Sequence, residues 1–178
     1  SFFASWPGKT GLQTDAAARL AAEDDYEAKL DVIRIWVKEW HFRIGVHHLR
    51  GLTDALEAGV QYADLARAAL SALWPEVQAN FARRYGPPPG KGAVILGMGS
   101  LGAGLLTPQS DLDLIVIYDP QNVEQSDGPR SLLTRPYYAR LTQAMITAVT
   151  TQTAPGRLYE ADMRLRPSGS QGPVATSW

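Results

Sequence analysis

Several features are absent from this sequence, and each absence narrows what the protein can be. It contains no cysteine, which excludes disulfide bonds and thiolate metal sites. Its formal net charge is -1, so no global basic field points to DNA or RNA. Its longest apolar run, Leu112 to Tyr118, is interrupted by Asp113 and has the length of a strand rather than of a membrane span. We therefore expect a cytoplasmic protein that binds neither nucleic acid nor a membrane.

The two ends of the chain also lack familiar signals. The start, Ser1 to Trp6, is apolar but has neither a basic leader nor a long apolar region, so it is not typical of a signal peptide. There is no initiator methionine, and the last residues, Ala175 to Trp178, contain no glycine or proline that would stop an element. We expect the chain to be a piece of a longer protein.

Residues 1–86 have the patterning of helices. Between Asp25 and His48 the apolar residues step by three or four positions, which places them on one helix face. These residues are Tyr26, Leu30, Ile33, Val37, Trp40 and Ile44. We expect Thr53 to cap a short helix that ends near Gly59, and a further helix to run from about Tyr62 to Tyr85. Pro75 lies within the latter and should kink or restart it.

The pattern changes at a proline- and glycine-rich segment, which we interpret as a linker over residues 87–92. Residues 93–178 then form a second part with mixed elements. Its expected elements are a buried strand Ala93–Leu96, a strand Leu112–Tyr118, a helix Arg135–Thr150 and a strand Leu158–Leu165. The polar segment Gln121–Thr134 between them is expected to be a mobile loop. This order predicts an α+β fold with a helical N-terminal region.

A glycine-rich turn, Gly97 to Gly104, follows the first expected strand. Glycines let a backbone approach a phosphate closely, and a helix beginning there would aim N–H groups at it. Alone, the glycine-rich turn is weak evidence for phosphate binding, because such turns after strands are usually only structural. It is not a P-loop, since no Gly-Lys-Ser/Thr ends it.

Asp111 and Asp113 add a stronger signal. On a strand, residues two apart point to the same face, so the two carboxylates would lie side by side. Adjacent carboxylates repel each other unless a counter-charge is present, and Mg²⁺ is suited to that role because it prefers carboxylate oxygens. For an isolated Asp-X-Asp, an acidic strand end in solvent would be the better interpretation.

A third carboxylate shifts the interpretation from an acidic strand end toward a metal site. Residues 159–166 alternate strictly between apolar and charged, and Asp162, Arg164 and Arg166 share the charged face. This face is either exposed to water or an active-site surface, with a carboxylate for metal and arginines for phosphate oxygens. A glycine turn, an Asp-X-Asp strand and one more aspartate on a later strand form the layout of two-metal nucleotidyl transfer.

The runs Gly97–Asp119 and Leu158–Gly169 resemble bacterial glutamine synthetase adenylyltransferase. The stretches Asp25–Gly51 and Ser126–Thr150 also fit, so the resemblance covers nearly the whole chain. That enzyme carries two related nucleotidyltransferase halves: one attaches AMP to a tyrosine of glutamine synthetase, and the other removes it by phosphorolysis. The ending Arg166-Pro167-Ser168-Gly169 is more similar to the C-terminal, adenylylating half.

The resemblance implies a polymerase-β-like nucleotidyltransferase core, with a small mixed sheet and helices. It implies that Asp111 and Asp113 hold two Mg²⁺ ions. Asp162 would bind one of these ions and orient the attacking tyrosine hydroxyl. Gly99 and Ser100 would cradle the phosphates of the substrate ATP. Glutamine synthetase would be the protein substrate, with the PII signal protein and glutamine as regulators.

The chain departs from the family at two positions. Family members often have Lys where Ser100 stands and Glu where Leu105 stands. The broader superfamily uses a Gly-Ser pair at the first position, whereas Leu105 removes a polar group near the turn. Two alternatives stay open: the deadenylylating half, with phosphate as nucleophile at the same site, and a nucleotide-sensing or docking domain that binds without turnover.

Overall fold

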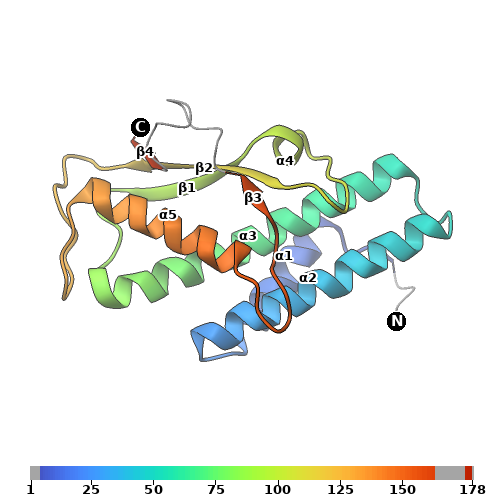
Figure 1. Cartoon of the computed structure of the whole chain (residues 1–178), viewed down its shortest axis with the longest axis horizontal. Coiled ribbons are helices and arrows are strands. Elements are labelled where there is room, and N and C mark those ends of the chain that lie inside the picture. The colour runs from blue at the N-terminus through green and yellow to red at the C-terminus, as the bar shows by residue number, and fades with distance from the viewer. Residues whose placement is uncertain (1–4, 163–174, 178) are drawn as a thin grey trace.

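The computed structural model describes residues 5–162 and 175–177 of the 178-residue chain, and these form a sheet with helices against it (Figure 1). The helices are α1 (Gly8–Ala21), α2 (Tyr26–Leu49), α3 (Ala55–Tyr85), α4 (Gly99–Ala103) and α5 (Thr134–Thr150). The strands are β1 (Gly92–Gly97), β2 (Leu112–Asp119), β3 (Ala161–Asp162) and β4 (Ala175–Ser177). None of the described helices is long and apolar enough to cross a membrane.

Helix α2 confirms the apolar stripe expected from the sequence. Its N-terminus is capped by Asp25, whose side chain accepts a hydrogen bond from the backbone N–H of Ala28 at 3.0 Å. Most of the stripe is buried against the neighbouring helices, while Tyr26 and Trp40 lie at its edges and are half-buried. The buried members are Leu30, Ile33, Val37 and Ile44.

Polar side chains of α2 fix its position against two other helices. The indole N–H of Trp36, a fully buried residue, donates to Asp15 of α1 at 2.7 Å. Arg34 is also buried, and its guanidinium contacts Asp31 at 3.0 Å and the carbonyl of Ala148 in α5 at 3.1 Å. Because a buried cation is costly unless it is paired, these contacts favour one position of Arg34 relative to the end of α5.

The expectation of two helices between Thr53 and Tyr85 was wrong, because α3 is continuous. Asp54 caps it, accepting from the N–H of Glu57 at 2.7 Å. Gly59 costs helix stability but does not stop α3, which buries many alanines and leucines against the rest of the molecule. Pro75 is exposed, so the carbonyl that it leaves without a helical donor can be hydrated, and the helix continues through it.

The proline-rich segment after α3 is held by α5. The hydroxyl of Tyr137 donates to the carbonyl of Gly86 at 2.9 Å, and that of Tyr138 donates to the carbonyl of Pro89. Both tyrosines are fully buried, and the ring of Tyr138 stacks on that of Tyr118 at a centroid distance of 4.2 Å. Helix α3 ends at Tyr85 and β1 begins at Gly92, the last residue of the linker expected at 87–92, and one hydrophobic core spans both parts.

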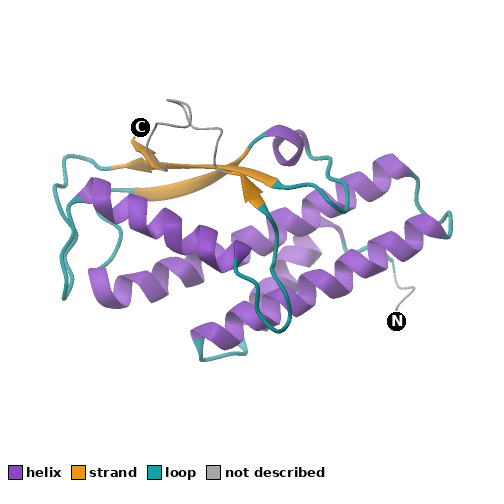
Figure 2. Ribbon diagram, in the orientation of Figure 1, coloured by secondary structure: helices purple, strands orange, loops and turns teal. Residues whose placement is uncertain are grey.

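The sheet is mixed, as expected for the α+β class. β1 is antiparallel to β2, whereas β3 and β4 are both parallel to β2. The order β1-β2-β3 places β2 in the centre. Figures 1 and 2 show α5 and α3 along one face of the sheet, with α1 and α2 beyond them. Alternate residues of β2 are buried against these helices, namely Leu112, Leu114, Val116 and Tyr118.

The described residues leave the opposite face of the sheet open, which corrects the expectation that Ala93–Leu96 is a buried strand. Val94 is 56% exposed and Leu96 is 41% exposed. They pair with Ile117 and Ile115 of β2, which are only partly buried. A continuous apolar run is typical of a strand covered on both faces, but here the described residues cover only one.

The loop expected over Gln121–Thr134 has more internal structure than its composition indicates. Ser126 is buried; its hydroxyl accepts from the N–H of Leu132 at 3.1 Å. The N–H of Arg130 donates to the carbonyl of Arg84 at the end of α3 at 3.0 Å. These bonds tie the loop to the bundle, and its mobility stays a prediction.

Candidate functional site

The glycine turn and Asp113 lie in direct contact. The N–H of Met98 donates to the carbonyl of Asp113 at 2.8 Å, which extends the β1–β2 ladder into the turn. Gly99 has a φ of +50°, and a Cβ atom added there would lie 2.3 Å from Oδ2 of Asp113. Both the backbone conformation and the close carboxylate therefore require glycine at this position.

Asp162 lies next to Asp113 across the sheet. The two residues are Cα partners in the parallel β2–β3 pairing, and the N–H of Leu112 fixes this register by donating to the carbonyl of Glu160 at 2.9 Å. Neighbouring strands are about 4.8 Å apart, and register partners point to the same face. Asp113 alternates with the buried residues of β2, so both carboxylates lie on the open face.

Asp111 is placed differently from the expectation. β2 begins at Leu112, so Asp111 precedes the strand and is exposed, and the alternation of a strand does not align it with Asp113. Within the described ranges, no three acidic or histidine side chains are grouped closely enough to hold one metal ion. The convergence of Asp111, Asp113 and Asp162 stays a prediction. Arg164 and Arg166 lie outside the described residues.

The pair formed by Asp113 and Asp162 suits Mg²⁺ in its chemistry. Both residues offer carboxylate oxygens, the donors that Mg²⁺ prefers, and both are partly accessible from the open face. The exposed Gly99 lies beside Asp113 and is followed by the exposed Ser100, so this side of the carboxylate is not closed off by a side chain of the turn's first residue. The residues present therefore fit the ion that the sequence predicts.

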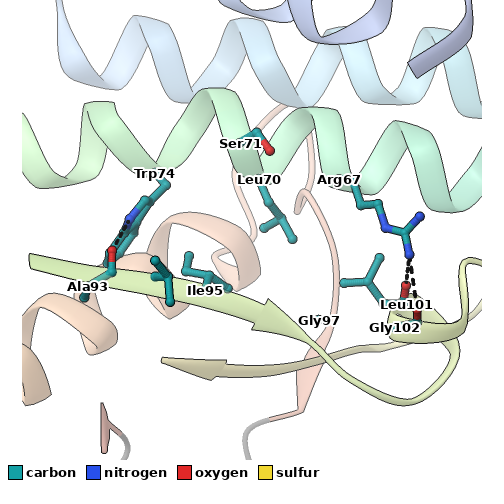
Figure 3. A pocket seen from close by; sticks show the side chains of 10 residues that line it. Arg67, Leu70, Ser71, Trp74, Ala93, Ile95, Gly97, Leu101 and Gly102 are labelled. Carbon is teal, nitrogen blue, oxygen red and sulfur yellow. Dashed lines mark hydrogen bonds between the residues drawn. The ribbon is translucent and has the colours of Figure 1, made fainter. Parts of the chain in front are cut away.

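Arg67 of α3 holds the turn in place, and Figure 3 shows it pointing from α3 to the end of α4. Its guanidinium donates to the carbonyls of Leu101 at 2.7 Å and Gly102 at 3.3 Å. These carbonyls belong to the last turn of α4, where a cation is favoured by the helix dipole. The sequence reasoning missed Arg67, although a lone arginine in the alanine-rich centre of α3 is a signal that could have found it.

A cavity of about 440 Å³ lies between α3 and the edge strand β1, beside the turn (Figure 3). Trp74 closes one end of it, with its indole N–H donating to the carbonyl of Ala93 at 3.4 Å. Arg67 and the turn close the other end.

Leu105, where family members often have Glu, lies close to Gly59 of α3: a Cβ added at Gly59 would be 3.4 Å from the side chain of Leu105. Its apolar side chain therefore contacts the bundle.

A small mixed sheet with helices on one face, and a glycine turn against a strand carboxylate on the other, has the make-up of a nucleotidyltransferase-like domain. The comparisons agree with this class. The family model described as glutamate-ammonia ligase adenylyltransferase matches residues 4–178. The chain belongs to this family.

Curated relatives cover nearly the whole chain. A bifunctional glutamine synthetase adenylyltransferase/adenylyl-removing enzyme from Brucella suis biovar 1 (strain 1330) is 42% identical over 99% of this chain and 18% of the relative. The protein of the same name from Mesorhizobium japonicum is 45% identical over 96% of this chain and 17% of the relative. The protein of the same name from Rhodopseudomonas palustris (strain TIE-1) is 43% identical over 98% of this chain and 18% of the relative. The chain thus spans less than a fifth of the length of these relatives.

Proposed function

We propose that this chain forms a nucleotidyltransferase unit that transfers AMP from ATP to a tyrosine hydroxyl of glutamine synthetase. The observation that carries the proposal is the contact between the Gly99 backbone and the Asp113 carboxylate, with Asp162 as its neighbour on β3. The names of the relatives supply the substrate class, since they describe enzymes that adenylylate glutamine synthetase and remove the group again.

Each part of the site has a role in this reaction. Asp113 and Asp162, together with Asp111, would hold Mg²⁺, which supplies charge neutralisation on the phosphates and lowers the pKa of a bound hydroxyl. A free tyrosine has a pKa of about 10, so its hydroxyl is a weak nucleophile at neutral pH. Asp162 orients that hydroxyl, and the turn at Gly99 and Ser100 binds the phosphates.

The bonds change in one displacement. The tyrosine oxygen forms a bond to the α-phosphorus of ATP, the bond from that phosphorus to the bridging oxygen breaks, and pyrophosphate leaves with the electron pair. The phenolic proton passes to solvent. The reverse activity in the relatives' name would use the same groups: inorganic phosphate attacks the phosphorus of the AMP–tyrosine linkage, the bond to the tyrosine oxygen breaks, and ADP forms while the tyrosine takes up a proton. Regulation of the cytoplasmic enzyme by glutamine and the PII signal protein belongs to the same proposal.

The test uses the polypeptide that carries this chain, glutamine synthetase, Mg²⁺ and ATP labelled in the α-phosphate. We expect label on a glutamine synthetase tyrosine, located by peptide mass spectrometry, and no label when EDTA replaces Mg²⁺. Release of label from pre-modified glutamine synthetase on addition of phosphate would assign the reverse direction. Binding of ATP with neither activity would refute the proposal in favour of a sensing domain.

A further inference from the structure

The short helix α4 depends on the rest of the fold for its position. It has five residues, two of them glycines, which is far below the length at which an isolated helix is stable. The carbonyls of its last turn lack donors within the helix. The N–H of Gly104 donates to one of them, that of Leu101, at 3.1 Å. The remaining contacts that fix α4 must come from another element.

Helix α3 supplies these contacts (Figure 3). The guanidinium of Arg67 bonds two last-turn carbonyls of α4 at 2.7 and 3.3 Å. The segment that leaves α4 is bonded as well, because the N–H of Leu106 donates to the carbonyl of Gly59 in α3 at 3.1 Å. The strand that leads into the turn is held by Trp74, through the carbonyl of Ala93. Helix α3 therefore bonds the turn in its middle and the segments on both sides of it.

Close packing links the end of α4 to the carboxylate of Asp113. A Cβ added at Gly97 would lie 2.8 Å from the side chain of Leu101, and one added at Gly102 would lie 2.8 Å from the carbonyl oxygen of Gly97. At the other end of α4, a Cβ added at Gly99 would lie 2.3 Å from the Asp113 carboxylate. The turn thus has little free space, so a displacement of the end of α4 moves Gly99 relative to Asp113.

We propose that Arg67 is a positioning residue for AMP transfer. Through the last-turn carbonyls of α4, it holds Gly99 and Ser100 where they meet the phosphates of ATP beside Asp113. This rests on the proposed function. Arg67 acts on the reaction through α4, and its role is to fix geometry, because a small misplacement of the groups that orient a substrate is costly to the rate.

The contacts of the guanidinium favour this role over direct binding of a phosphate. Helix α4 begins at Gly99, whereas Arg67 bonds the carbonyls at the opposite end of that helix. A further nitrogen of the guanidinium lies 3.9 Å from the carboxylate of Asp64, which offsets part of its charge. The side chain of Arg67 is 34% exposed. The cation is thus engaged within the protein, away from the residues that face the phosphates.

Three variants of the polypeptide that carries this chain test the proposal. Arg67→Ala removes both bonds to α4. Arg67→Lys keeps a cation but lacks the planar fork that reaches two carbonyls. Arg83→Ala is the matched control, because Arg83 is an exposed arginine of the same helix that makes none of the contacts with the turn.

The first measurement needs neither nucleotide nor metal. Hydrogen exchange is followed at the amides of Gly102, Gly104 and Leu105, whose N–H groups are bonded to carbonyls of the turn. Exchange at these amides reports local opening of α4. The second measurement is steady-state AMP transfer, with Mg-ATP and glutamine synthetase varied separately, at a temperature well below the melting temperature of each variant.

We expect Arg67→Ala to speed exchange at these amides and to lower kcat/KM for Mg-ATP about 100-fold, the loss that a misplacement of about 1 Å can cause. KM for glutamine synthetase should stay unchanged. Arg67→Lys should restore part of both losses, and Arg83→Ala should match the parent. If Arg67→Ala does not fold, the same two measurements on Arg67→Lys decide the question.

Two results would overturn this role while AMP transfer by the parent stands. A lower kcat/KM for Mg-ATP with unchanged exchange in the turn would make Arg67 a direct phosphate ligand. Faster exchange or a lower melting temperature, with kcat/KM unchanged, would show that Arg67 contributes to stability alone. If the parent itself transfers no AMP, the proposed function falls, and the positioning role falls with it.

Discussion

The helical bundle and the sheet differ in how completely they are covered. α3 alone buries a dozen residues, including Leu65 and Leu73 with no exposed surface. The described residues pack on one face of the sheet only, and its other face exposes Val94 and Leu96 next to the strand positions of Asp113 and Asp162. The difference teaches that the buried core and the candidate site lie on separate surfaces, so mutations in the two regions should have separable effects.

The largest effect is expected for Asp113→Asn, which tests the open face. The change removes a charge but nearly keeps the shape. AMP transfer should fall by about 100-fold or more, because metal positioning and charge stabilisation supply most of the catalysis. In EDTA the variant should melt at the same or a higher temperature, since repulsion between Asp113 and Asp162 is relieved; that repulsion is about 1 kcal/mol.

Thermal melts in EDTA and in Mg-ATP, together with the transfer assay, check this prediction. The parent should gain stability from Mg-ATP, and the variant should lose most of that gain. A variant that melts clearly lower in EDTA yet keeps its transfer rate would show that Asp113 is a structural carboxylate.

Leu73→Ala tests the bundle. Removing a fully buried leucine should lower the free energy of unfolding by about 3 kcal/mol, through lost burial and the cavity left behind. Leu96→Ala is the matched control on the open face and should cost only about 0.5 kcal/mol. Urea denaturation measures both. The contrast between bundle and sheet is contradicted if the two substitutions lower the free energy of unfolding equally, or if Leu73→Ala abolishes AMP transfer well below its melting temperature.

Gly99→Ala and Gly8→Ala form a pair that separates backbone strain from the site. Both glycines have positive φ, +50° and +71°, so alanine should cost each about 1–2 kcal/mol. Only at Gly99 would the new Cβ meet a carboxylate, that of Asp113; nothing lies within 4 Å of the Cβ position at Gly8. We expect AMP transfer to be lost in Gly99→Ala and retained in Gly8→Ala. Equal activities in the two variants would mean that the turn does not shape the site.

The smallest effect is expected at the junction of the two regions. Tyr137→Phe removes the hydroxyl bond to Gly86, which should cost about 1 kcal/mol at pH 7. Burial raises the pKa of Tyr137 to about 12, above its ordinary value of 10. The folded state therefore favours the neutral phenol, and this stability is complete below pH 10 and is lost as the pH rises toward 12.

Midpoints of urea denaturation, measured between pH 9 and pH 12, test the direction of this pH dependence. The parent should lose stability over this range, and Tyr137→Phe should lose less of it, although other tyrosines also titrate. A variant with the same pH dependence as the parent would contradict the assignment to Tyr137.

Local pattern predicted much of this molecule. The stripe of α2 and the strand over Leu112–Tyr118 follow directly from residue spacing. Tertiary packing decided the rest. Gly59 and Pro75 are helix breakers in isolation, but the burial of the rest of α3 outweighs them.

Parts of the candidate site could not be predicted from local sequence patterns, because tertiary packing determines them as well. Whether Val94 is covered depends on what packs on the far face of the sheet, and no alternation within four apolar residues reveals that. Arg67 lies on a helix far along the chain from Asp113, and only the packing of that helix on the sheet brings it to the turn.

The two phenol bonds to the linker have a mechanical consequence. A run of three prolines between glycines has the composition of a flexible joint, and such a joint would let the sheet swing away from the bundle. Here the carbonyls of Gly86 and Pro89 are bound by buried hydroxyls of α5, which itself packs on α3. Separating the sheet from the bundle would require these bonds to break first. A displacement imposed on α3 or α5 is therefore passed to β1, and through it to the glycine turn, without being absorbed between them.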